Sequence, residues 1–270
     1  MELIFAKSKW EVWNEPTKEF LRRVKADGFD ATEFYLNEGP DSPEDLIHLH
    51  TEYGLKLIAQ IVTEGRNFKE HFDSLSRLAD KVLKCSPVLV NCQPGRDYFP
   101  FDENLKILEK LVELSEGTGI LFTAETHRGR CTYSLIETAK YLEALPQLCL
   151  TTDVSHWMVV HESDLSAQTD NLDLAVSASR HIHARVGYEE GPQVTDPRAP
   201  EWEAHLNNHI SIWQKIADNC KSIGMKYMTI TPEFGPPKYM HTIPFSNEPV
   251  ADPWEINTAM KEILGKRLNL

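Results

Sequence analysis

The chain has 270 residues, of which 41% are hydrophobic and 26% are charged. This mix is typical of a globular protein and excludes a disordered, fibrous or membrane-embedded chain as a description of the whole sequence. Lys and Arg number 28 and Asp and Glu number 41, which gives a formal net charge of −13. Because a nucleic-acid-binding surface needs a basic face, this charge disfavours nucleic acid as a partner, and it disfavours anionic membranes for the same reason.

The sequence contains no segment that predicts export or membrane insertion. No run of about 18 apolar residues occurs, and the first ten residues read as a strand because they lack the basic and apolar regions of a signal peptide. The five cysteines form no C-x-x-C pair, which favours reduced thiols. We therefore expect a cytoplasmic protein with no membrane partner.

Short apolar segments alternate with longer amphipathic segments along the whole chain. Eight short segments are candidate strands: Glu2–Ala6, Ala31–Tyr35, Leu55–Val62, Pro87–Gln93, Gly119–Thr126, Leu148–Val154, His181–Val186 and Lys226–Pro232. Between the strands, apolar residues recur at helical spacing, most clearly over 207–221. Ser42 and Asp252, each followed by proline, are typical N-caps and mark the starts of two helices.

Eight strand–helix units in a chain of this length predict an α/β fold, a single-domain (β/α)₈ TIM barrel over residues 1–270. A long loop is expected at about 187–202, after the seventh strand. An open doubly wound sheet has the same alternation, but it usually carries a glycine-rich turn after the first strand. The corresponding residues here, 6–10, contain no glycine, and no linker divides the chain.

Polar residues stand at the ends of four consecutive predicted strands. They are Glu125, Asp153, His183 and Glu233, and in a barrel they meet at the mouth, where TIM-barrel enzymes place their chemistry. Three carboxylates this close would repel one another unless a cation lay between them. The residues therefore predict a site for one divalent metal ion. The oxygen-rich set favours Mn²⁺, with Mg²⁺, Co²⁺ or Zn²⁺ as alternatives.

Residues around the predicted metal site are candidates for binding a substrate. Arg185 shares a strand face with His183 and lies nearer the mouth, so we expect its cation to face the substrate. His156 follows Asp153 by three residues and reaches the mouth only if the strand ends near Val154. The remaining candidates are Trp10 and Trp13 as an aromatic wall, and Glu33, Gln60, Asn91 and Gln93 as hydroxyl-binding or barrel-layer residues.

The order E…D-x-x-H…H-x-H…E resembles the xylose isomerase-like TIM-barrel superfamily along essentially the whole chain. That superfamily contains sugar and sugar-phosphate isomerases and epimerases, and also apurinic-site endonucleases. The resemblance to its ketose 3-epimerases implies that Glu125, Asp153, His183 and Glu233 hold the metal. It also implies that Glu125 and Glu233 act as the catalytic acid/base pair. His156 and, at a looser spacing, Arg185 would bind substrate.

Two departures from the superfamily patterns narrow the expected activity. The ketose 3-epimerases carry another glutamate six residues after the first ligand, where Cys131 stands here, so that particular activity is in doubt. The endonucleases need additional histidines at the ends of strands three and four, where Gln60 and Asn91 stand. Together with the acidic charge, this makes an endonuclease the least favoured member of the superfamily.

These observations predict a metal-dependent sugar isomerase or epimerase that acts beside a carbonyl through an enediolate. A metal-dependent dehydratase or lyase on a polyol or keto-sugar is an alternative with the same residues. A non-catalytic sugar-binding barrel is an alternative of another class. The expected partner is a small sugar or sugar derivative, and the resemblance implies a homo-oligomer. No glycine-rich phosphate cradle is present, which slightly favours an unphosphorylated substrate.

Overall fold

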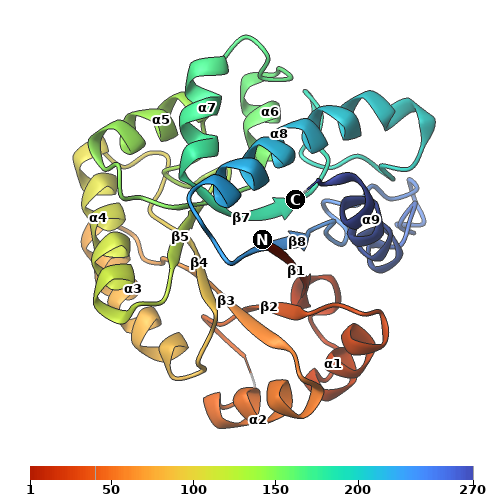
Figure 1. The fold of residues 1–270 in the computed structure, drawn as a ribbon, viewed down its shortest axis with the longest axis horizontal. Helices are drawn as coiled ribbons and strands as arrows, with labels where there is room; N and C mark the ends of the chain where they lie inside the picture. The colour runs from red at the N-terminus through yellow and green to blue at the C-terminus, as the bar shows by residue number, and fades with distance from the viewer. Residues whose placement is uncertain (40, 270) are drawn as a thin grey trace.

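Eight parallel strands close into a barrel in the order of the chain (Figure 1). The computed structural model describes residues 1–39 and 41–269. Each strand pairs with the next, and β8 returns to pair with β1 through the register of Glu2 with Tyr227 and Phe5 with Ile230. Helices follow the strands and cover the outside. The predicted (β/α)₈ barrel is confirmed.

The strands are β1 (Glu2–Ser8), β2 (Ala31–Tyr35), β3 (Lys56–Val62), β4 (Leu89–Gln93), β5 (Phe122–Glu125), β6 (Leu150–Thr152), β7 (Ser179–Ala184) and β8 (Tyr227–Pro232). The α-helices are α1 (Thr17–Ala26), α2 (Pro43–Tyr53), α3 (Phe68–Leu83), α4 (Phe101–Thr118), α5 (Leu135–Ala144), α6 (Val154–His161), α7 (Thr169–Ala178), α8 (Glu203–Ser222) and α9 (Pro253–Arg267). Two short 3₁₀ helices are η1 (Lys9–Val12) and η2 (Pro200–Trp202).

Every predicted strand overlaps an observed one, but several ends differ. The fifth strand starts at Phe122 rather than Gly119, because Gly119 has a φ of 69° and ends α4 in the left-handed conformation that favours glycine. The sixth strand ends before Asp153, whose carboxylate caps the N-terminus of α6. This early end allows α6 to begin beside the mouth, as the position of His156 required.

The alternation of side chains along the strands creates two packed regions. One small apolar cluster fills the barrel near the N-terminal ends of its strands, which we call the lower barrel. It consists of Ile4, Ala6, Ala31, Ile58 and Leu89. The larger core lies between the strands and the surrounding helices. Because the lower barrel is closed by apolar side chains, polar chemistry is confined to the end where the strands terminate.

A buried ion pair attaches the first loop to the last helix. Lys7, on the outer face of β1, donates to the carbonyl oxygen of Trp254 at 3.0 Å, and its amine lies 3.0 Å from the Glu11 carboxylate. Both side chains are buried, so the pKa of Lys7 is lowered and that of Glu11 is raised to about 7. Glu11 belongs to η1, which also carries Trp10. The pair therefore fixes Trp10 relative to the barrel.

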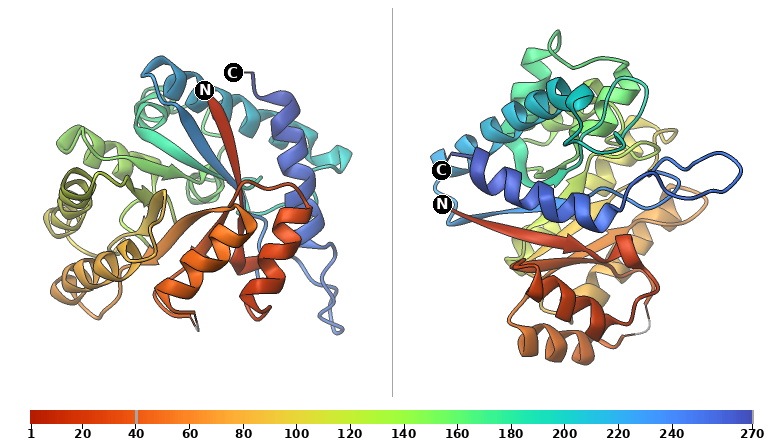
Figure 2. Two further views of the ribbon diagram at one scale, coloured as in Figure 1. Left: turned by 60° about the horizontal axis from the view of Figure 1, so that its bottom comes forward. Right: turned by 90° about the vertical axis from the view of Figure 1, so that its right-hand side faces the viewer.

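The loop after β7 is tied down at two points. The Gly187 N–H donates to Nε2 of buried His209 at 3.2 Å. Gln193 accepts from the Gly235 N–H at 2.7 Å and donates to the Gly235 carbonyl oxygen at 3.2 Å. These contacts join the loop after β7 to the one after β8. Figure 2 shows the chain between β8 and α9, in blue, extending beyond the barrel.

None of the helices within residues 1–39 and 41–269 is both long and apolar enough to cross a membrane.

We expect the protein to lose stability in acid because the buried side chain of His209 must stay unprotonated in the folded state. Its Nδ1–H donates to the His205 carbonyl oxygen at 2.8 Å, so Nε2 must stay unprotonated to accept from Gly187. Burial lowers the pKa of His209 from 6.5 to about 4. Since the unfolded state binds the proton first, the free energy of unfolding should fall by about 1.4 kcal/mol per pH unit between these values. Urea unfolding of wild type and His209→Gln from pH 7.5 to 4.5 measures this contribution. Exposed His48→Gln is the control, and equal pH slopes in all three proteins would contradict the prediction.

Candidate active site

Glu125, His183 and Glu233 converge at the mouth of the barrel. Each offers a ligand atom that lies within 4.8 Å of the other two. Nδ1 of His183 lies 3.0 Å from a Glu233 oxygen and 3.8 Å from a Glu125 oxygen, yet it is buried and makes no hydrogen bond. One buried nitrogen without a hydrogen-bond partner and two carboxylates are together a suitable set of ligands for a divalent cation. The residues therefore fit a metal ion.

Glu33 determines which nitrogen of His183 faces the carboxylates. Its buried side chain lies on β2, and its oxygens are 3.0 and 3.1 Å from Nε2 of His183. The carboxylate also accepts from Thr231 at 2.6 Å and Asn91 at 2.9 Å, and it lies 3.3 Å from His181. Because an ionised carboxylate only accepts, Nε2 carries a proton and Nδ1 retains the free position. Glu33 therefore orients His183 and is not available to substrate.

Three amide side chains surround the carboxylate of Glu125. Gln60 donates to it at 3.1 Å, Asn91 at 2.7 Å and Gln93 at 2.9 Å. Burial raises the pKa of Glu125 to about 7, with His183 opposing the shift and the nearby carboxylates adding to it. The predicted hydroxyl-binding residues on β3 and β4 thus hold a catalytic candidate in place.

Asp153 faces Arg185. One of its oxygens accepts from the N–H of Ser155 at 3.0 Å, and the other pairs with the Arg185 guanidinium. The same guanidinium lies 3.7 Å from Glu233. Asp153 therefore borders the cluster of Glu125, His183 and Glu233 without being part of it. Three of the four predicted ligands therefore lie in one cluster. The fourth, Asp153, is separated from it by the guanidinium of Arg185.

The two predicted substrate-binding residues occupy different depths. Arg185 lines the mouth cavity, and its guanidinium carbon lies 4.5 Å from the centre of the Tyr239 ring. His156 lies behind it, with Nε2 2.8 Å from Arg185 and its ring 4.1 Å from that of His127. Burial and the neighbouring His127 and Arg185 hold the pKa of His156 well below its ordinary value. His156 supports the cavity wall without reaching its surface.

The mouth cavity has a volume of about 520 Å³, within the usual range for small-molecule sites. Its floor includes Glu125, Arg185 and Glu233. The walls are Trp10, Trp13, Tyr35, Glu38, Gln60, Val62, Gln93, His127 and Tyr239. The sequence predicted the two tryptophans but not Tyr239, which lies in an irregular loop. No residue of the 187–202 loop lines this cavity, so among the described residues that loop is a neighbour of the mouth.

Comparisons with known proteins identify the fold. No protein-family model and no curated protein matches the sequence. A xylose isomerase-like TIM barrel protein from Mycobacterium smegmatis, solved with magnesium, is 13% identical, with a TM-score of 0.66 over 98% of each chain. This chain has the xylose isomerase-like barrel fold. A sugar phosphate isomerase/epimerase from Parabacteroides distasonis shares that fold, with 12% identity and a TM-score of 0.64 over 99% of this chain and 96% of the other.

The same barrel also carries other activities. The probable 3-DHS dehydratase AsbF from Bacillus anthracis is 13% identical, with a TM-score of 0.62 over 98% of this chain and 99% of the other. Endonuclease IV from Thermus thermophilus is 12% identical, with a TM-score of 0.60 over 98% of this chain and 99% of the other. Because these identities are low, the fold alone is shared, and the activity must be argued from the side chains.

Gly235 lies directly against the Trp10 ring in the wall of the mouth cavity, with no room for a larger side chain. A Cβ at this position would lie 2.0 Å from the Trp10 ring, which in turn meets Tyr239 edge-on at 5.2 Å between ring centres. Gly235→Ala should therefore displace Trp10 and cost about 1–3 kcal/mol of unfolding free energy. Tryptophan emission and chemical denaturation measure both effects. Gly117→Ala is the control, because its Cβ would meet nothing within 4 Å. Unchanged emission and stability in Gly235→Ala would refute the contact.

Proposed function

We propose that this protein is a divalent-metal-dependent sugar isomerase or epimerase that acts beside a carbonyl through an enediolate. The observation that carries the proposal is the unpartnered Nδ1 of His183, buried between Glu125 and Glu233. The substrate is a small sugar or sugar derivative. We propose no nucleic-acid or membrane partner, and a cytoplasmic homo-oligomer remains the expected form.

The proposed metal ligands are Glu125, His183 and Glu233, with Asp153 as the fourth. The oxygen-rich set favours Mn²⁺, and Mg²⁺ is compatible with the same chemistry. Asp153 retains lone pairs beyond those used by Ser155 and Arg185, so it can serve the metal and Arg185 together. When bound, the metal supplies a Lewis acid that polarises the substrate carbonyl.

The chain's own residues supply proton transfer and orientation. Glu125 and Glu233 come from different strands and both line the mouth cavity, so a sugar held there has a carboxylate to remove a proton and another to return one. The amide shell of Glu125 fixes its oxygens. Arg185 presents its guanidinium to the cavity and donates to the substrate oxygen that gains negative charge. Its contacts with Asp153 and Tyr239 hold it in that direction.

Dehydration of a polyol or keto-sugar is the second candidate, because a probable dehydratase shares the fold. The same base would remove a proton, and the neighbouring hydroxyl would leave in place of reprotonation at carbon. A non-catalytic sugar-binding barrel would need neither glutamate as an acid or base. An endonuclease is not proposed, since Gln60 and Asn91 hold Glu125 at strand ends where that activity needs metal-binding histidines.

Metal add-back and solvent exchange test the proposed function. We expect chelated protein to bind one Mn²⁺, Mg²⁺, Co²⁺ or Zn²⁺ per chain, and Asp153→Asn to weaken that binding. The loaded protein should exchange a carbon-bound hydrogen of an aldose or ketose with D₂O, followed by NMR. Loss of a hydroxyl along with exchange would identify the dehydratase. Glu233→Gln should lower exchange by at least about 100-fold with an unchanged circular dichroism spectrum. Full exchange in Glu233→Gln, or no metal binding by wild type, would overturn the proposal.

Glu33 gives a prediction that does not depend on turnover. Removing its charge in Glu33→Gln should weaken metal binding by about 10–100-fold, because His183 would lose the partner that fixes its orientation. Isothermal titration with Mn²⁺ measures the affinity, and the Co²⁺ absorption spectrum reports a change in the ligand field. Glu11→Gln, at a buried carboxylate outside the mouth, is the matched control. Equal affinities in Glu33→Gln and wild type would remove Glu33 from the metal site.

A further inference from the structure

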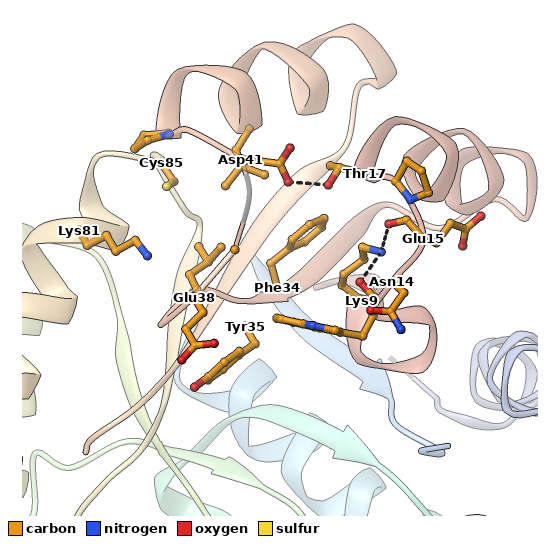
Figure 3. A pocket seen from close by; sticks show the side chains of 16 residues that line it. Lys9, Asn14, Glu15, Thr17, Phe34, Tyr35, Glu38, Asp41, Lys81 and Cys85 are labelled. Atoms are coloured by element: carbon orange, nitrogen blue, oxygen red, sulfur yellow. Dashed lines mark hydrogen bonds between the residues drawn. The ribbon is translucent and has the colours of Figure 1, made fainter. Parts of the chain in front are cut away.

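A second cavity of about 610 Å³ lies beside the mouth, between the loops that follow β1 and β2 (Figure 3). Trp13, Tyr35 and Glu38 line both cavities. The Trp13 and Tyr35 rings are 5.7 Å apart, so two aromatic side chains and one carboxylate form the wall shared by the two spaces. The second cavity is therefore adjacent to the reacting carboxylates and on the same face of the barrel.

The shared wall is weakly anchored. Trp13 is 43% exposed. Among the residues the structure describes, the Glu38 carboxylate has no hydrogen-bond or ion-pair partner, in contrast to the buried carboxylates of the mouth. A ligand that extends from one cavity into the other would displace exposed side chains and would break no buried hydrogen bond. The two cavities can thus hold two parts of one molecule.

The charges of the second cavity favour a neutral ligand over an anion. Its lining carries three carboxylates, those of Glu15, Glu38 and Asp41, and two amines, those of Lys9 and Lys81, and Lys81 donates to the Asn37 carbonyl oxygen at 3.1 Å. The amine of Lys9, which Figure 3 shows beside Glu15, is enclosed by the carbonyl oxygens of Val12, Trp13 and Glu15, so it has no free donor for a phosphate. Phosphate sites instead present free Arg, Lys or backbone N–H donors.

The remaining lining matches an uncharged ring with hydroxyl groups. Phe34, Leu46 and Cys85 provide apolar surface, and Figure 3 shows the Phe34 ring in the middle of the cavity lining. The Asp41 carboxylate accepts from Thr17 at 2.6 Å and has further lone pairs for a ligand hydroxyl. Apolar walls with a few polar groups are the usual composition of a small-molecule site.

We propose that the second cavity binds an additional, uncharged sugar ring, so that the substrate is a neutral disaccharide whose carbonyl end lies in the mouth between Glu125 and Glu233. This inference rests on the proposed function and specifies its substrate class. The first ring occupies the mouth cavity, and the linkage passes the wall of Trp13, Tyr35 and Glu38.

Calorimetric titration of the Mn²⁺-loaded protein tests the proposal. The probes are cellobiose, lactose and maltose, compared with glucose and galactose. We expect at least one disaccharide to bind about tenfold or more tightly than its hexose. Asn14 is exposed and lines the second cavity, so Asn14→Trp should fill it and remove that advantage while leaving hexose affinity within about twofold. Glu143→Trp, on an exposed part of α5, is the matched control.

Each outcome bears on a separate statement. If hexoses bind and exchange hydrogen but no disaccharide binds more tightly, the second cavity is not a sugar site and the proposed function stands. A disaccharide preference that survives in Asn14→Trp would place the second ring elsewhere and overturn the inference. Glucose 6-phosphate binding more tightly than glucose, with loss in Asn14→Trp, would show an anion site and also overturn it. If no sugar binds, both proposals fail together.

Discussion

The mouth of the barrel buries more negative charge than its own cations neutralise. Glu33, Glu125, Asp153 and Glu233 lie among apolar strands, and the cation beside them is the guanidinium of Arg185. Burial of a carboxylate is costly unless charge or hydrogen bonds compensate it. The surrounding structure follows from this constraint. Arg185 pairs with Asp153, amides surround Glu125, and Glu33 takes the proton-bearing nitrogen of His183. The position that remains, beside Nδ1, is where an added cation would relieve the greatest repulsion.

The loops around the mouth give the cavity above these charges its shape. Tyr239 covers the guanidinium of Arg185, and Trp10 meets Tyr239 edge-on. Trp10 can take that place because Gly235 leaves room for its ring, and because the buried pair of Lys7 and Glu11 fixes η1. Aromatic side chains therefore reach the cavity from the segments that follow β1 and β8, which are neighbours because the barrel closes.

The sequence was sufficient for the barrel and for the residues at its mouth, because both depend on local pattern. Apolar runs and helical spacing predicted every strand, and parallel strands place their ends at one level. The sequence did not reveal that Glu33 holds His183, because these residues are 150 positions apart and meet only across the closed barrel. The pairing of Asp153 with Arg185 depends on the same closure. Tyr239 follows no periodic pattern, and nothing in its loop marked it. The fifth strand starts three residues later than predicted because Gly119 ends α4.

The double hydrogen bond between Gln193 and Gly235 makes the mouth asymmetric. It joins the loops after β7 and β8 beside Glu233, so hydrogen bonds tie together the side of the mouth that carries Arg185 and Glu233. The loops after β1 and β2 are joined by a side-chain hydrogen bond from Thr17 to Asp41. Among residues 1–39 and 41–269, no backbone hydrogen bond links them across the wall of Trp13, Tyr35 and Glu38. Changes of length or sequence in these two loops would alter the size of molecule that the mouth admits, while Arg185 and Glu233 kept their positions. In such a barrel, one side of the opening can change to admit a different substrate while the opposite side keeps the same chemistry.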